Sequence, residues 1–152
     1  MGRDTGGVKG MGLRKGDEVI SADVIGANEG DLLVVTENGY GKRTKLADYP
    51  RKGRGGLGVK TAQLVEGKGR LVGARVVREG YAVMLISTAG TVIRMAVEDI
   101  KRSGRATQGV IVMRFKTDDE RVSALAPVVE SEDDEAATEE SDSEVASVPS
   151  EA

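Results

Sequence analysis

The sequence predicts an all-β fold of propeller-like blades, about two and a half of them, followed by an acidic tail. Glycine is abundant, with 21 residues among 152, whereas the aromatic residues are only three tyrosines and one phenylalanine. Short runs rich in valine and isoleucine alternate with turn residues, which is typical of all-β chains. A repeat at a fixed spacing then indicates that one supersecondary unit recurs along the chain.

The repeat is clearest in a glycine-rich segment, here called the joint, with the pattern G-R-x-x-x-G-V. It reads GRDTGGV, then GRGGLGV, then GRATQGV, and its arginines are Arg3, Arg54 and Arg105. Successive joint arginines are 51 residues apart. We therefore expect repeat units at about residues 1–51, 52–102 and 103–129, and a tail at 130–152.

Each unit contains predicted strands in the same order. An apolar strand follows the joint, and a second strand is expected at residues 18–25, 70–77 and 121–129. A third strand, at 31–37 or 82–88, leads through a tight turn into a fourth, at 40–45 or 91–95. The Asn38-Gly39 pair predicts a type I′ hairpin, which has positive φ at both positions. Four short strands in roughly 50 residues make one propeller-like blade.

The residue types exclude several classes of chemistry. Because the chain has no cysteine and no histidine, it cannot form disulfides, Cys/His zinc sites or histidine-based acid–base catalysts. Any metal ion would have to be a hard cation held by carboxylates. No apolar run approaches the roughly 18 residues of a membrane span. We expect no catalytic residue, no cofactor-binding residue, no metal ligand and no membrane contact in this chain.

The charge is divided between the body and the tail. Residues 1–129 hold all 22 basic residues and 15 acidic ones, so the body carries +7. Residues 130–152 hold ten acidic residues and no basic one, so the tail carries −10. The tail is also rich in serine and alanine and has no aromatic residue, so we expect it to be disordered.

The second joint also matches the dinucleotide-binding spacing, as Gly53-x-Gly55-x-x-Gly58. A loop of that kind follows a strand and opens a helix whose N-terminus meets the pyrophosphate. Here Pro50 precedes the joint, and glycines soon interrupt the segment that follows. The two sister joints also lack the inner glycines. We therefore interpret the segment as a joint between blades, in which glycines shape the turn.

Longer motifs support a family resemblance over about residues 1–129. They are GVKGMGLRKGDEVISADVI (7–25), LLVVTENGYGKRTKLADYPRKGRGGLGVKT (32–61) and GRATQGVIVMR (104–114). In this order and spacing they resemble the family of C-terminal domains of DNA gyrase A. The corresponding domain of topoisomerase IV is the alternative within the same family.

The resemblance implies a β-pinwheel, with six blades that exchange strands and a basic perimeter around which DNA wraps. In gyrase this wrapping supports ATP-dependent negative supercoiling. The family's wrapping motif reads Q-R-R-G-G-K-G. Residues 54–58 match its last five positions except at Leu57, and Lys52-Gly53 stand in place of Gln-Arg. We expect this segment to be a degenerate copy of the motif in a later blade.

The same resemblance implies the partners of the chain. These are double-stranded DNA, the remainder of gyrase A, and gyrase B in an A2B2 complex, in the cytoplasm at the nucleoid. The sequence lacks the breakage–reunion domain and its DNA-linking tyrosine, so we expect the last part of a gyrase A polypeptide, without strand cleavage of its own. ATP and Mg²⁺ would be bound by other parts of the enzyme.

Basic residues near turns and edge strands are the candidates for DNA contact, because the blade interiors are apolar. Isolated lysines on strand edges protect against unwanted pairing, but clusters that recur at the repeat spacing favour phosphate binding. Contacts of this kind position a duplex without reading its bases. The candidates are Arg3, Lys9, Lys42, Arg43, Lys45, Arg51, Lys52, Arg54, Lys60, Arg94, Lys101, Arg102 and Arg105.

Two other classes of function remain open at this point. A propeller-type protein-interaction module, similar to the regulator-of-chromosome-condensation repeats, would show little salt-dependent affinity for DNA. A nucleotide-binding enzyme would bind ATP or NAD, and Gly55→Ala or Gly58→Ala would abolish that binding. A salt-titrated DNA-binding assay beside a nucleotide-binding assay separates the three.

Deleting residues 130–152 should tighten DNA binding. Ten acidic groups tethered to a body of charge +7 compete with the phosphates of DNA at high local concentration. The measurement compares the duplex affinity of the full chain and the shortened chain at equal salt. An unchanged or weaker affinity after deletion would contradict the competition hypothesis.

Overall fold

The computed structural model describes residues 3–26 and 29–129, so the acidic tail lies outside the described residues. Within these ranges the structure contains seven β-strands and two short 3-10 turns, at Leu46–Asp48 and Val97–Asp99. The strands are β1 (Asp31–Thr36), β2 (Tyr40–Lys45), β3 (Leu71–Val77), β4 (Ala82–Ser87), β5 (Val92–Ala96), β6 (Val110–Ile111) and β7 (Val122–Val128). No helix in the described part of the chain could cross a membrane.

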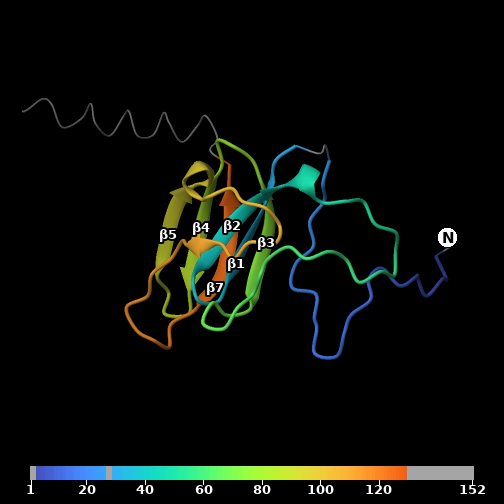
Figure 1. The fold of residues 1–152 in the computed structure, drawn as a ribbon, viewed down its shortest axis with the longest axis horizontal. Coiled ribbons are helices and arrows are strands. Elements are labelled where there is room, and N and C mark those ends of the chain that lie inside the picture. The colour runs from blue at the N-terminus through green and yellow to red at the C-terminus, as the bar shows by residue number, and fades with distance from the viewer. Residues whose placement is uncertain (1–2, 27–28, 130–152) are drawn as a thin grey trace, which may run out of the picture.

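The strands form two antiparallel sheets (Figure 1). The first sheet has the order β3-β1-β2-β6, and the second has the order β5-β4-β7. In each sheet a hairpin takes its third strand from further along the chain, because β3 pairs with β1 and β7 pairs with β4. The all-β prediction is confirmed. Each sheet nevertheless combines strands from neighbouring sequence repeats.

The sequence repeat relates the two sheets element by element. Adding 51 residues carries β1 onto β4, β2 onto β5, the first 3-10 turn onto the second, and β3 onto β7. Backbone hydrogen bonds repeat at the same step: Leu46 N–H donates to the Gly30 carbonyl, and Val97 N–H donates to the Tyr81 carbonyl. Equal spacing in sequence thus gives equal local structure.

The strand predicted at residues 18–25 is wrong. Within this segment the structure assigns no strand, although it lies beside β3: the Ser21 hydroxyl donates to the Ala74 carbonyl over 2.7 Å. The amide of Val76 donates to Asp23 over 3.0 Å and holds the pKa of that carboxyl below its usual range. This segment aligns with residues 70–77 at a step of 52, so residues 19–25 correspond to β3. β3 pairs with β1, and a strand forms only when such a partner pairs with it.

The strand predicted after each joint appears only after the third. There it is the two-residue β6, which pairs with Tyr40 and Gly41 of β2. After the first two joints the described chain has no strand. A strand again forms only where a partner is present, because the segment after the third joint lies beside β2.

The turn between β1 and β2 is not type I′. Gly39 has a φ of +84°, but no described residue other than glycine has positive φ, so Asn38 does not adopt the expected conformation. Gly39 N–H donates to the Thr36 carbonyl, and Tyr40 N–H donates to the Thr36 hydroxyl. This pattern is a type I turn closed by a glycine bulge. Gly90, with a φ of +81°, closes the β4–β5 turn in the same way.

The hydrophobic core lies between the two sheets. Leu33 and Val35 of β1 are buried with Val83 and Leu85 of β4, and Met113, two residues after β6, completes the cluster. Where β3 meets β7, Gly73 leaves room for a leucine side chain that a Cβ would meet at 2.4 Å. The core therefore requires the strand exchange that places β3 and β7.

Gly39→Ala should destabilise the fold more than Gly90→Ala. Both glycines have φ near +80°, which costs an alanine about 1–2 kcal/mol. At Gly39 the added Cβ would also meet the Met113 carbonyl oxygen, whereas at Gly90 nothing lies within 4 Å. Urea unfolding of the two variants measures the difference. Equal losses of stability would show that the segment after β6 does not pack on this turn.

Candidate nucleic-acid interface

Three loop segments that contain the joints are linked to one another by backbone hydrogen bonds. We call them joint 1 (residues 3–12), joint 2 (51–63) and joint 3 (101–110). Joints 1 and 2 are linked by hydrogen bonds from Gly55 N–H to the Gly10 carbonyl and from Gly12 N–H to the Gly56 carbonyl. Joints 2 and 3 are linked by Gln63 N–H, which donates to the Thr107 carbonyl over 3.0 Å. In Figure 1 the first two segments extend to one side of the sheets.

Glycine permits this close arrangement of backbone. The glycine before the last valine of each joint pattern has positive φ, +79° at Gly7, +77° at Gly58 and +82° at Gly109. A Cβ at Gly12 would lie 3.2 Å from the Gly55 carbonyl oxygen, and one at Gly109 would lie 2.8 Å from that of Gly41. The joint glycines therefore serve the turns and the contacts between segments. No α-helix follows joint 2 in the described chain, so the geometry of a dinucleotide loop is absent there.

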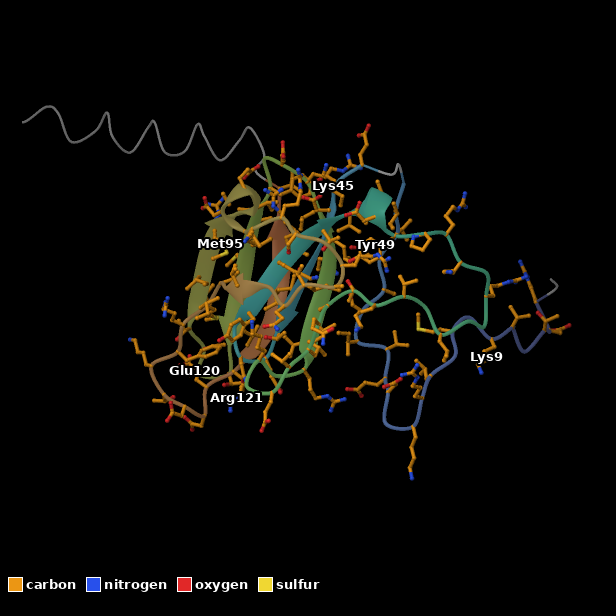
Figure 2. All side chains as sticks on the ribbon, in the orientation of Figure 1. Lys9, Lys45, Tyr49, Met95, Glu120 and Arg121 are labelled. Atoms are coloured by element: carbon orange, nitrogen blue, oxygen red, sulfur yellow. The ribbon has the colours of Figure 1, made fainter. Side chains whose placement is uncertain are left out.

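Basic side chains project from all three joints. Seven of the predicted contacts are exposed there: Arg3, Lys9, Arg51, Lys52, Arg54, Lys60 and Lys101. Figure 2 shows Lys9 far from Glu120 and Arg121, which lie at the other side of the sheets. The structure thus brings these seven residues onto one connected strip of backbone, which we call the joint strip. Such a strip presents positive charge to a polyanion over a length greater than a single loop.

Arg105 joins the strip from a partly buried position. Its guanidinium donates to the Lys60 carbonyl over 3.3 Å and lies 5.9 Å from the centre of the Tyr49 ring. Tyr49 in turn shares a short hydrogen bond with Thr61. Arg105 is therefore held between joint 2 and joint 3 by a carbonyl and an aromatic face. Arg105 is partly exposed, so it stays among the candidate contacts.

Lys42 and Arg43 lie inside the molecule, although the sequence suggested DNA contacts for both. Lys42 is 1% exposed and Arg43 is 7% exposed. The Lys42 ammonium donates to the Gly104 and Arg105 carbonyls, and the Arg43 guanidinium donates to the Ile100 carbonyl and to Asp31. Their donors are used by the protein in this structure, so we do not count them among the contacts at the surface.

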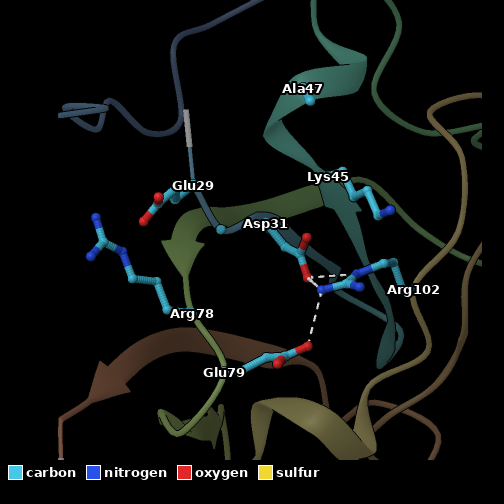
Figure 3. A pocket seen from close by; sticks show the side chains of 8 residues that line it. Glu29, Asp31, Lys45, Ala47, Arg78, Glu79 and Arg102 are labelled. Atoms are coloured by element: carbon cyan, nitrogen blue, oxygen red, sulfur yellow. Dashed lines mark hydrogen bonds and ion pairs between the residues drawn. The ribbon is translucent and has the colours of Figure 1, made fainter. Parts of the chain in front are cut away.

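Asp31 is the centre of a charged cluster at the start of joint 3 (Figure 3). Its Oδ2 atom accepts hydrogen bonds from Arg43 Nη1 over 2.9 Å and from Arg102 Nε over 3.0 Å. Removing one member of the buried pair of Asp31 and Arg43 costs about 3–5 kcal/mol, because the other charge stays buried. Arg102 also pairs with Glu79 over 3.3 Å, and its hydrogen bond to Asp31 raises the pKa of the guanidinium. Arg102, a predicted DNA contact, is thereby committed to two carboxylates.

The last two predicted contacts lie outside the joint strip. Lys45 is exposed at the end of β2, beside the same cluster, where Figure 3 shows it near Arg102. Arg94 is exposed on β5 of the second sheet. It repeats Arg43 in sequence, but the counterpart of Asp31 is Ala82, so the buried pair of the first sheet has no equivalent. The repeat in sequence does not conserve the role of this arginine.

Sequence reasoning missed the residues that hold the strip together. Gln63 links joints 2 and 3, Tyr49 supports Arg105, and Asp31 fixes Arg102. None of them is basic, and a search for phosphate contacts passes over them. A single signal was present, because Tyr49 lies just before joint 2 at a repeat position. Among the described residues, no three acidic side chains gather to hold a metal ion.

Comparison with known proteins agrees with this architecture. The family model described as "DNA gyrase C-terminal domain, beta-propeller" matches residues 1–25, 30–78 and 82–128. DNA gyrase A of Staphylococcus aureus strain MRSA252 is 48% identical over 142 residues, which cover 93% of this chain and 16% of that protein. The chain therefore spans about one sixth of the length of this relative.

Two solved structures are similar at the level of the fold and the sequence. The C-terminal domain of DNA topoisomerase IV superposes with a TM-score of 0.75 and 25% identity, covering 89% of this chain and 42% of that one. A DNA gyrase A C-terminal domain superposes with a TM-score of 0.62 and 25% identity, covering 66% and 34%. The repeat, the exchanged strands and these matches agree, and the chain belongs to the DNA gyrase C-terminal domain family.

Proposed function

We propose that this chain is a DNA-binding and DNA-wrapping part of DNA gyrase A. The observation that carries the proposal is the joint strip, in which three neighbouring segments from distant parts of the sequence present exposed lysines and arginines. A duplex lying across the strip would cross all three joints in turn. Each joint would contribute contacts to successive phosphates, and together they would curve the DNA along the molecule.

The chemistry of the strip favours the DNA backbone over the bases. Lysine and arginine neutralise phosphates and release counterions, so binding weakens with salt by a log–log slope of about 0.9 per contact. Backbone contacts carry no sequence information, and the choice of site depends on how easily the DNA bends. The interface therefore suits wrapping of many sequences.

In the whole enzyme this wrapping would support ATP-dependent negative supercoiling. The partners would be the remainder of gyrase A and the gyrase B protein in an A2B2 complex, at the nucleoid in the cytoplasm. ATP and Mg²⁺ would be bound by those other parts, and strand cleavage would belong to them too. The relatives that carry the name gyrase A, at 48% identity, support this assignment.

Part of a topoisomerase IV is the second candidate. The observation in its favour is the superposition on the C-terminal domain of DNA topoisomerase IV, with a TM-score of 0.75. That structure is 25% identical to this chain, whereas the gyrase A relative is 48% identical, so gyrase remains the better assignment.

The double variant Lys52→Ala/Arg54→Ala should weaken duplex binding and reduce the salt slope by about 1.8, at about 0.9 for each lost contact. The control Arg114→Ala/Lys116→Ala removes the same charge from exposed residues outside the joint strip. The measurement is duplex affinity at several salt concentrations, with two unrelated DNA sequences. If the two double variants lose affinity equally, net charge alone would explain binding, and the joint strip would not be the interface.

A further inference from the structure

Lys42 carries a charge into the interior at a place where no carboxylate of the described residues pairs with it. All three of its N–H donors are used, on the Gly104 carbonyl over 2.7 Å, the Arg105 carbonyl over 2.8 Å and the Thr107 hydroxyl over 3.1 Å. The side chain is 1% exposed, and burial lowers the pKa of its ammonium. A buried charge is costly unless hydrogen bonds replace its lost hydration. Here joint 3 supplies all of those bonds.

The second sheet shows which residue occupies the position equivalent to Lys42 when no joint packs on the strand. Its counterpart in β5, 51 residues later, is Ile93, which is half-buried and packs against the core. In the described chain β5 forms the edge of its sheet, whereas β2 is followed by joint 3 and β6. The position therefore holds a lysine on β2, where joint 3 packs against the strand, and an isoleucine on β5, where no joint of the described chain does.

Joint 3 is also the part of the strip that lies against joint 2. Arg105 and Thr107, both bound by Lys42 on one side, reach joint 2 on the other through the Lys60 carbonyl and Gln63 N–H. Thr107 closes the same loop through its hydrogen bond with Gly104. The geometry points to Lys42 as a positioning residue for DNA binding, which fixes joint 3 from below and thereby places Arg105 for a phosphate. This inference rests on the proposed function.

The test is duplex affinity across a salt series for Lys42→Met, Arg105→Ala and the double variant of the full chain. Methionine has a similar length and leaves no buried charge. If Lys42 acts through Arg105, each single variant lowers the salt slope by about 0.9, and the double variant lowers it by about 0.9 as well. Amide hydrogen exchange at residues 104–109 should rise in Lys42→Met, while exchange in β1 and β4 stays at the level of the unchanged protein. A matched control, Lys116→Met, removes an exposed lysine and should leave exchange in joint 3 unchanged.

The inference is overturned if Lys42→Met leaves affinity and exchange unchanged, or if the double variant lowers the slope by about 1.8, which indicates two independent contacts. If Lys42→Met fails to fold, Thr107→Val removes one acceptor from joint 3 without removing the lysine. This variant should raise exchange in joint 3 and show the same non-additivity with Arg105→Ala, and additivity would overturn the inference. The proposed function fails separately, when neither Lys52→Ala/Arg54→Ala nor Arg105→Ala weakens binding.

Discussion

The pairing of β1 with β3, and of β4 with β7, is the constraint on which the rest of the structure depends. Each hairpin gains its third strand, β3 or β7, from a part of the chain that follows a long segment outside the sheet. The chain between β2 and β3 must therefore run outside the first sheet, and that chain contains joint 2. Because the next unit repeats the same path, joint 3 returns beside joint 2, and their backbones bond to each other. The strip of basic side chains follows from the exchange of strands.

Charge is used in two ways in this molecule. Exposed lysines and arginines on the joints remain available to a polyanion, whereas Lys42, Arg43 and Arg102 are committed to carbonyls and carboxylates. These committed residues hold joint 3 in place. Arg102 connects the start of the joint to Asp31, and the Lys42 ammonium donates to carbonyls of its loop. The proposed attraction to DNA therefore depends on basic residues of the loops, whereas the internal order of joint 3 depends on Lys42, Arg43 and Arg102.

Strands that pair with another strand of the chain were predicted correctly from the sequence. The predictions failed for segments that have no strand to pair with. Residues 71–77 and 122–128 were recognisable because the repeat doubles the signal, but residues 18–25 have the same pattern and form no strand. The burial of Lys42 was beyond prediction for a similar reason. Its surroundings are supplied by residues 104–107, which come about 60 positions later and reach it only through the fold. The exposure of seven predicted contacts on the joints could be predicted, since turn glycines and basic residues there are local signals.

We propose that a duplex lies across the three joints. Lysine acylation with and without duplex DNA, followed by mass spectrometry, locates the DNA, because every lysine reports on its own surroundings. DNA should protect Lys9, Lys52, Lys60 and Lys101, whereas Lys116 should keep its reactivity and buried Lys42 should stay unreactive throughout. Protection of Lys116 with full reactivity at the joint lysines would show that the duplex does not lie across the joints.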